Sequence, residues 1–253
     1  RIAKRQVSVP LGRAHFDTKD VPLDPYLMGV LLGDGSFRGS VLRLSTPEKD
    51  IVDRVRALLP EGYAMNSPAS WSDIDYAITA PNKSEGRRHK IRAALEEMGL
   101  WGHLSLDKFI PVQYMRNSHE IRMEVARGLL DTDGWVDRLG QPHFTTSSRR
   151  LAEDFQELAE SLGASVIWGE KESASGNIAY DLGVRVEDAR KWFWLPRKAE
   201  KATPRKKPAK RTISTIEYVG MKQCQCIMVD DPRHLYLTDR FIVTHNTVLA
   251  PTT

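Results

Sequence analysis

The chain has 253 residues, of which 41% are hydrophobic and 28% are charged, and its formal net charge is +4. This hydrophobic fraction is too high for a disordered chain, and the length suits two or three globular units. The sequence contains no run of about eighteen apolar residues and no apolar signal-peptide core. We therefore expect no membrane partner and a cytoplasmic location, in a host of bacterial or phage type.

Both ends of the sequence indicate a fragment of a longer protein. The chain begins at Arg1 instead of Met, and it ends in the small, apolar stretch TVLAPTT (247–253). The two cysteines, Cys224 and Cys226, are too close together for an ordinary disulfide. A role for a free thiol therefore stays open.

A segment near the N-terminus is repeated later in the chain. YLMGVLLGDGSF (26–37) and EVARGLLDTDGWV (124–136) share the frame Gly-x-x-x-x-Asp-Gly at an offset of 99 residues. Each copy is followed by a short strand, a Ser/Thr helix cap and a helix with apolar residues at helical spacing. These apolar residues are Ile51, Val52, Val55, Leu58 and Leu59 in the first half, and Leu151, Phe155, Leu158 and Leu162 in the second.

Further strand-like stretches at 76–79 and 165–168 and a helix at about 89–98 complete the pattern. Each half then reads as helix, strands, helix, strands, helix. Two copies predict a pseudo-dimer, because a solenoid needs about three or more repeats.

The repeated segment predicts two helices packed side by side. Gly29 and Gly33 would let the first helix approach a partner backbone closely, and Gly128 with Thr132 forms a similar small stripe on the second. Each helix would end at an Asp-Gly pair, with the glycine suited to a left-handed C-cap. This arrangement would bring the two aspartates of the pairs together.

The aspartates of these pairs are Asp34 and Asp133. Two carboxylates at one place repel each other, and a divalent metal is the simplest compensation. Oxygen ligands suit Mg²⁺, and such a site can support phosphodiester cleavage. A single Asp-Gly would be read as an ordinary turn, but two in one frame with the same following elements favour a metal site.

The two segments resemble the motifs of LAGLIDADG homing endonucleases, over roughly 24–202. The resemblance implies that Asp34 and Asp133 are catalytic acids and metal ligands, and that double-stranded DNA is a partner. LDKFIP (106–111) resembles the Lys-x-Ile-Pro element of that family, which makes Lys108 a candidate catalytic lysine; a surface lysine is the alternative. In LPRKAEK (195–201), Lys198 is its candidate counterpart.

A basic segment follows the second half. Its Lys and Arg residues are Arg190, Lys191, Arg197, Lys198, Lys201, Arg205, Lys206, Lys207, Lys210 and Arg211, with Glu200 as the only acid between them. Such a cluster favours a polyanionic partner, because neutralising phosphates releases counterions. A solvated linker with Pro204 and Pro208 is the alternative.

The last part of the sequence predicts a small β unit. Residues with β-favouring neighbours recur along it, namely Val219, Ile227, Val229, Leu235, Leu237, Phe241 and Val243. The Asp-Asp-Pro-Arg stretch (230–233) is expected to form the turn between two runs.

Two stretches of this unit resemble intein splicing blocks, CIMVDDPRHLYLTDRF (226–241) and IVTHN followed by Thr247. The resemblance implies a splice junction between Asn246 and Thr247. The Asn246 amide can attack its own backbone carbonyl and cleave the chain as a succinimide, while His245 moves protons. The Thr247 hydroxyl can accept an acyl group as an ester.

Cys226 occupies a position where many inteins carry Asp, and Thr244 precedes the His-Asn pair. With Thr247 downstream, these residues resemble class 3 inteins, in which the block cysteine attacks the upstream junction. Cys226 would then be the first nucleophile; a buried, unreactive thiol is the alternative. Cys224 is expected to be structural or incidental. The upstream part of such a splicing domain is not visible in the sequence, so we expect no splicing by this chain alone.

The sequence therefore predicts an α+β protein in which a LAGLIDADG endonuclease of two αββαββα halves is inserted in a β-rich Hint-type splicing domain. The expected units are an N-terminal splicing remnant at 1–20, the endonuclease at 21–203, a basic linker at 204–211, the C-terminal splicing part at 212–246 and host protein at 247–253. Its expected function is splicing combined with Mg²⁺-dependent double-strand cleavage of the intein-less host gene.

The alternative is a maturase-like or degenerate DNA-binding module without nuclease activity. Splicing is expected to need no cofactor, and the endonuclease to act as a monomeric pseudo-dimer. The stretch after Asn246 resembles the end of a phosphate-binding loop, so the expected host is a P-loop ATPase.

Overall fold

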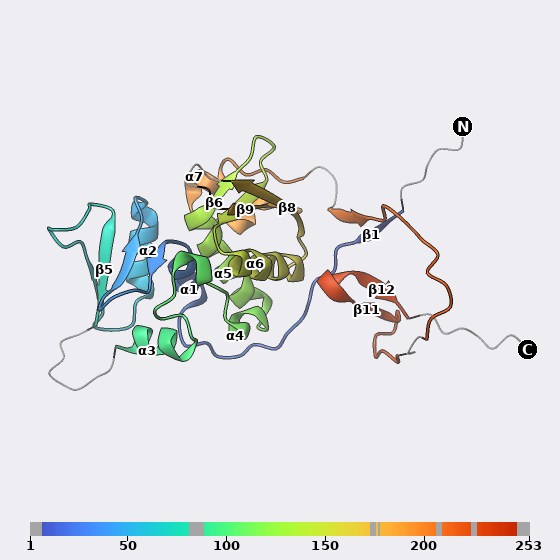
Figure 1. The fold of residues 1–253 in the computed structure, drawn as a ribbon, viewed down its shortest axis with the longest axis horizontal. Helices are drawn as coiled ribbons and strands as arrows, with labels where there is room; N and C mark the ends of the chain where they lie inside the picture. The colour runs from blue at the N-terminus through green and yellow to red at the C-terminus, as the bar shows by residue number, and fades with distance from the viewer. Residues whose placement is uncertain are drawn as a thin grey trace, which may run out of the picture.

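The computed structural model describes residues 7–80, 89–172, 176, 178–205, 209–223 and 227–246. Two α/β halves lie side by side, and a smaller β-rich part lies at the end of the molecule nearest the second half (Figure 1). The α+β fold class expected from the repeat is confirmed. None of the helices in these ranges is both long and apolar enough to cross a membrane.

The first half follows the expected order of elements. In chain order it consists of α1 (Pro25–Asp34), β2 (Gly35–Ser36), β3 (Leu42–Ser45), α2 (Lys49–Leu58), β4 (Ala64–Asn66), β5 (Asp75–Thr79) and α3 (Lys90–Glu97). Its strands form an antiparallel sheet in the order β2-β3-β5-β4. Along β3, Leu42 and Leu44 are buried and Arg43 is exposed, so one face of the sheet packs on the core and the other is open.

The second half repeats this topology. Its elements are α5 (His119–Asp133), β6 (Gly134–Val136), β7 (Pro142–Thr146), α6 (Arg149–Ser161), β8 (Ser165–Glu172) and β9 (Ile178–Arg185), with the sheet order β6-β7-β9-β8. The expected closing helix is interrupted, because the chain forms the short η3 (Ala189–Trp192) and then α7 (Pro196–Ala199). Pro196 begins α7 and cannot continue a helix from the residues before it. Between the halves lie η2 (Ser105–Asp107) and α4 (Val112–Met115).

Side-chain caps begin three of the long helices. The Asp24 carboxylate accepts backbone amides of the first turn of α1, and the hydroxyls of Ser118 and Ser148 do the same for α5 and α6. The Ser/Thr cap expected for α2 is wrong, because Glu48 stands at the N-cap without a side-chain cap bond. Thr46 lies two residues too early and accepts the Glu48 amide at 3.4 Å.

The apolar faces predicted for α2 and α6 point into one hydrophobic core. Leu151, Phe155, Leu158 and Leu162 are all buried on α6, while on α2 Ile51, Val52 and Val55 are buried and Leu58 and Leu59 are half-buried. Buried residues of both halves form one continuous cluster that includes the apolar residues of α1 and α5. The two halves are therefore a single packed body.

The β-rich part joins the beginning and the end of the described chain. Strand β1 (Ser8–Pro10) pairs with β10 (Lys210–Thr212), and β11 (Leu235–Leu237) pairs with β12 (Val243–His245). The expected turn at Asp-Asp-Pro-Arg is confirmed, because the His234 amide donates to the Asp231 carbonyl at 2.8 Å; the β11–β12 hairpin itself turns at η4 (Asp239–Phe241). Arg240 and Phe241 are left-handed there, with φ of 56° and 54°, and no glycine signals this turn in the sequence.

Candidate functional site

Helices α1 and α5 pack backbone against backbone at their glycines. A Cβ atom on Gly29 would lie 2.4 Å from a backbone oxygen of α5, and one on Gly128 would lie 2.5 Å from a backbone oxygen of α1. One turn later, a Cβ on Gly33 would lie 2.0 Å from the Thr132 hydroxyl oxygen. The predicted stripe of small residues on each helix is therefore confirmed.

The glycines that end both helices have a different role from the one expected. The left-handed C-cap is wrong, because Gly35 and Gly134 are extended, with φ of −79° and −95°. A Cβ on either would lie 2.3 Å from a carbonyl oxygen of the preceding helical turn, that of Leu31 or Leu130. The absence of a side chain thus lets the chain leave each helix directly into the first strand of its sheet.

Asp34 and Asp133 are the last residues of α1 and α5, and the structure brings their half-buried carboxylates together. A Cβ on Gly33 of α1 would lie 3.4 Å from Oδ2 of Asp133. Burial and the neighbouring Asp133 charge raise the pKa of Asp34 to about 7. Burial also raises the pKa of Asp133. The site therefore disfavours two bare anions and favours a cation.

The carboxylate oxygens at the helix ends fit a hard divalent cation. Within the described ranges no group of three or more His, Cys, Asp or Glu side chains lies together to hold a metal. Asp34 and Asp133 would therefore supply two carboxylates, leaving further positions for water and phosphate oxygens. Mg²⁺ is commonly bound in this way, because it retains several waters.

A buried lysine holds the end of each helix. The side chains of Lys108 and Lys198 are buried, so the surface-lysine alternative for Lys108 is wrong. The Lys108 ammonium donates to the carbonyls of Leu32, Gly33 and Gly35 at 2.9, 3.0 and 2.7 Å, and that of Lys198 donates to Leu130, Asp131 and Gly134 at 2.8, 2.6 and 2.6 Å. Leu32, Gly33, Leu130 and Asp131 lie in the last turns of α1 and α5, where a helix leaves most carbonyls without an intrahelical donor, and Gly35 and Gly134 begin the following strands.

Burial lowers the pKa of both lysines to about 8, and nearby carboxylates oppose this shift. For Lys108 those carboxylates are Asp133 and Asp34. For Lys198 they include Asp131 and Asp34. Each ammonium group therefore binds carbonyls at a helix end and also opposes the rise in the pKa of Asp34 and Asp133.

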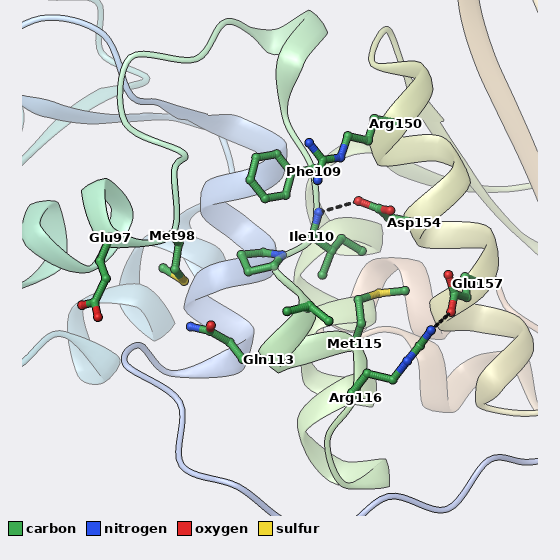
Figure 2. A pocket seen from close by; sticks show the side chains of 12 residues that line it. Glu97, Met98, Phe109, Ile110, Gln113, Met115, Arg116, Arg150, Asp154 and Glu157 are labelled. Carbon is green, nitrogen blue, oxygen red and sulfur yellow. Dashed lines mark hydrogen bonds and ion pairs between the residues drawn. The ribbon is translucent and has the colours of Figure 1, made fainter.

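Helix α6 fixes the stretch that carries Lys108. The Ser148 hydroxyl donates to the Lys108 carbonyl at 2.7 Å, and the Asp154 carboxylate accepts the Ile110 amide at 2.8 Å. Figure 2 shows this junction beside a cavity of about 390 Å³ among α3, α4 and α6. Arg150 lies over the Phe109 ring at 3.9 Å on the same side. Lys108 itself follows η2 in a loop, so these contacts fix its backbone from α6.

Asp131 is a buried acid that the sequence analysis missed. It accepts the Tyr26 hydroxyl at 2.9 Å and the backbone amides of Trp194 and Leu195, and burial raises its pKa to about 6. Asp131 thereby ties the segment before Lys198 to α5. In the repeated frame its counterpart is Leu32, and this exchange of an apolar residue for an acid was the available signal.

The open face of the second sheet carries aromatic and charged side chains. Trp135 stacks on His143 with ring centroids 4.2 Å apart, and Lys171 pairs with Asp181 at 2.9 Å. On the first half, the Arg43 guanidinium lies 4.3 Å from the Trp71 ring centroid. Such a mixture of cations and aromatics suits contact with nucleic acid.

The C-terminal hairpin holds the remaining candidate residues. His245 lies opposite Leu235 in the ladder, and the Asn246 amide continues it by donating to the His234 carbonyl at 2.7 Å. The Asn246 side-chain nitrogen donates to the carbonyl of Ile227. His234, which sequence reasoning did not select, has its ring centroid 6.0 Å from that of His245.

Thr244 lies between these residues and the hairpin turn, with its hydroxyl 3.5 Å from that of Thr238. Cys226 and Thr247 lie outside the described residues. Ile227, which Asn246 contacts, follows Cys226 directly in the sequence. The structure therefore brings Asn246 to the block that contains the cysteine.

The chain is similar to solved structures of the homing endonuclease I-DmoI. A structure of its mesophilic variants has a TM-score of 0.46 and 16% identity, covering 68% of this chain and 92% of that one. A complex with DNA and Mn has a TM-score of 0.43 and 14% identity, covering 64% and 89%.

Curated relatives are replicative DNA helicases. The helicase DnaB of Mycobacterium intracellulare is 32% identical over 238 residues, which is 89% of this chain and 35% of the helicase. DnaB of Nostoc sp. is 28% identical over 150 residues, which is 54% of this chain and 17% of the helicase. The chain thus spans about a third of the first relative and less of the second.

The model of the LAGLIDADG-like domain matches residues 120–193. This range begins in α5, continues through the sheet of the second half and ends just after η3. It contains Asp133 and the Gly128 contact with α1. The chain therefore contains a LAGLIDADG-like domain, which forms the second half of its two-fold α/β body.

Proposed function

We propose that the chain is an intein that combines protein splicing with site-specific double-strand DNA cleavage. The observation that carries the nuclease function is the pair of carboxylates at the ends of α1 and α5, each helix end being held by a buried lysine. Asp34 and Asp133 would hold Mg²⁺, which when bound supplies an activated water and stabilises the leaving oxygen. Lys108 and Lys198 hold the carboxylates in register and reduce their mutual repulsion.

DNA would lie across the open faces of the two sheets. These faces offer the cations Arg43, Lys171 and Arg185 and the rings of Trp71 and Trp135. Cations on such a surface attract the phosphate backbone, and strands can enter the major groove to contact base edges. The paired acids would then face the backbone at the centre of the site.

The splicing function rests on the hairpin and its contact with the preceding block. The Asn246 side-chain nitrogen would attack the Asn246 carbonyl carbon, form a succinimide and break the bond to Thr247, while His245 moves the proton. Cys226 would attack the upstream junction, and the Thr247 hydroxyl would receive the acyl group. The hydrogen bond from the Asn246 side chain to the Ile227 carbonyl supports a common site for the two splicing blocks.

The strand pairing supports one splicing part assembled around the nuclease. Residues 8–10 pair with 210–212, and Leu11 bridges to Ile242. We propose that 1–20 and 212–246 belong together in this way and that 21–203 form the nuclease. Strand β10 begins at Lys210, so the last two residues of the proposed linker at 204–211 are in a strand.

The flanking host protein is proposed to be a replicative DNA helicase. The DnaB relatives support this choice, because the chain matches only a part of each of them. This proposal narrows the host expected from the sequence, a P-loop ATPase, to the replicative helicases. The DNA target would accordingly be the helicase gene without the insert.

The nuclease function is tested with the purified chain and a DNA fragment of the uninterrupted helicase gene. We expect one double-strand break with Mg²⁺ and none with a chelator in place of the metal. Stable DNA binding without cleavage would select the maturase-like alternative. If the chain neither binds nor cleaves this DNA, both the nuclease function and the maturase-like alternative are contradicted.

The splicing function is tested in the intact precursor that contains this chain. Asn246→Ala should block release at the downstream junction, because the succinimide can no longer form. Cys226→Ala should abolish the branched intermediate, and Cys224→Ala serves as the matched thiol control. A branched intermediate in the Cys226→Ala precursor would contradict the class 3 assignment.

A further inference from the structure

A buried acid of the LAGLIDADG-like domain holds the turn of the proposed splicing hairpin. Glu160 lies near the end of α6, within the matched range 120–193, and its side chain is 1% exposed. Its carboxylate accepts Nε and Nη2 of Arg240 at 3.0 and 2.5 Å and lies 3.0 Å from Nη2 of Arg211. One carboxylate therefore joins α6 to both η4 and β10.

Arg240 has an unusual backbone conformation for a residue with a side chain. Its φ of 56° and ψ of 29° are left-handed, and it forms the turn between β11 and β12. The Arg211 guanidinium also donates to the Arg240 carbonyl at 2.9 Å. Because non-glycine residues enter this conformation at an energetic cost, surrounding contacts must hold it. Glu160 holds the Arg240 guanidinium, and Arg211 holds the Arg240 carbonyl.

The hairpin has few other means of support. Its strands are three residues long and half-buried or exposed, and a two-stranded hairpin of this size is marginal in water. Gly12 also fits closely against the turn, where a Cβ would lie 2.6 Å from the Phe241 carbonyl oxygen. Leu11 bridges to Ile242 next to it. The turn is thus seated between the N-terminal stretch and α6.

We propose that Glu160 is a positioning residue for splicing: by holding Arg240 it fixes the hairpin turn and, through β12, the place of Asn246. Asn246 follows β12 directly, so a displacement of the turn is transmitted along one short strand. This inference rests on the proposed splicing function. It makes the nuclease domain a structural component of the splice site, which its removal would disturb.

The test compares Glu160→Gln with Glu153→Gln in the intact precursor. Glu153 lies on the same helix, is exposed, and pairs with Arg149 of that helix. We expect Glu160→Gln to slow cleavage after Asn246 by about tenfold or more, because small misplacements of reacting groups have effects of this size. Hydrogen exchange over 235–245 should become faster, while DNA cleavage and the melting temperature of the α/β body stay at parent values. Glu153→Gln should match the parent in all of these.

A second variant separates positioning from a general loss of structure. If Glu160 acts through Arg240, the double variant Glu160→Gln/Arg240→Gln should cleave no more slowly than Glu160→Gln alone. If the double variant slows cleavage after Asn246 by the product of the two single effects, the proposal is overturned. Loss of DNA cleavage in Glu160→Gln would also overturn it. Parent-rate junction cleavage in Glu160→Gln would overturn this inference alone. A parent precursor that never cleaves after Asn246 would instead defeat the splicing function itself.

Discussion

Asp34 and Asp133 are held where two negative charges are costly. Each is the last residue of its helix, at the negative end of the helix dipole, and each carboxylate is partly withdrawn from water. Burial is the largest cause of the raised pKa of both acids, and for Asp34 the charge of Asp133 comes second. A divalent cation would relieve all of these effects at once.

The pKa of Asp34 leads to a prediction about metal binding and pH. Without metal, its pKa of about 7 means that protons compete with Mg²⁺ below neutral pH. The apparent affinity for Mg²⁺ should fall by at least about tenfold for each pH unit below 7, since a proton must leave Asp34 and the raised pKa of Asp133 adds to the competition. The measurement is the Mg²⁺ concentration for half-maximal DNA cleavage between about pH 6 and about pH 8. An unchanged midpoint across this interval would contradict the assignment.

At the scale of elements, the buried lysines act as caps of the two central helices. The three N–H donors of Lys108 meet a cluster of carbonyls from the last turn of α1 and the first residue of β2. The same arrangement recurs at Lys198 with carbonyls 99 residues further along the chain. The repeat therefore extends to polar contacts that no helix or strand pattern encodes.

Replacement of Lys108 by Met tests this capping role. Lys108→Met should lower the free energy of unfolding by about 2–3 kcal/mol, because buried carbonyls lose their donor. DNA cleavage should be lost as well, since the α1 end that carries Asp34 is no longer held. Lys49→Met, on the exposed side of α2, is the matched control and should behave like the parent. Lost cleavage at unchanged stability in chemical denaturation would point to a purely catalytic lysine instead.

The glycine contact between α1 and α5 makes a second prediction at this scale. Gly29→Ala should destabilise the protein by about 3 kcal/mol, because the new methyl group meets backbone atoms that cannot turn aside. Gly169→Ala, in an extended strand with the nearest neighbour at 3.3 Å, should change stability little. The melting temperatures of the two variants show whether the contact between α1 and α5 tolerates a methyl group. Equal melting temperatures would show that the helices can separate without cost.

At the scale of the whole molecule, the sequence predicts those features that depend on local periodicity. The spacing of apolar residues on α2 and α6 and the Gly-x-x-x-x-Asp-Gly frame led to two halves with one topology. The frame also predicted the close approach of α1 and α5. The element pattern follows from residues near one another in the chain, and the approach of α1 and α5 follows from the repetition of one local frame.

Features that depend on tertiary contacts escaped prediction. Gly35 is extended because a helix carbonyl lies against it, and the turn at Arg240 is held by Glu160 from another part of the chain. Asp131 stands where the first copy of the repeat has an apolar residue, and its buried carboxylate is tolerated because it accepts the backbone amide of Trp194. For Arg240 and Asp131 the partner lies far away in the sequence, so no local pattern records it. For Gly35 the carbonyl is that of Leu31 in the preceding helical turn, and only the path of the chain into the strand reveals the contact.

Hydrogen bonds also fasten the flanking stretches to the second half, in addition to the chain connection through the proposed linker. The Arg122 guanidinium, at the start of α5, donates to the Ala14 carbonyl at 2.7 Å, and the Ala14 amide donates to Ser161 at 2.9 Å. Together with the Glu160 contacts, these bonds fasten both flanking stretches to the second half. A deletion of the proposed nuclease part should therefore leave the proposed splicing part with unpaired polar groups.

The central claim is that two carboxylates at the helix ends cut DNA, and one measurement tests it most directly. Double-strand cleavage of the uninterrupted helicase gene with Mg²⁺ is measured for the parent, Asp34→Asn, Asp133→Asn and the exposed control Asp53→Asn. Each helix-end variant should lose cleavage yet still bind the DNA, while Asp53→Asn cuts like the parent. Cleavage by Asp34→Asn and Asp133→Asn at the parent rate would contradict the account.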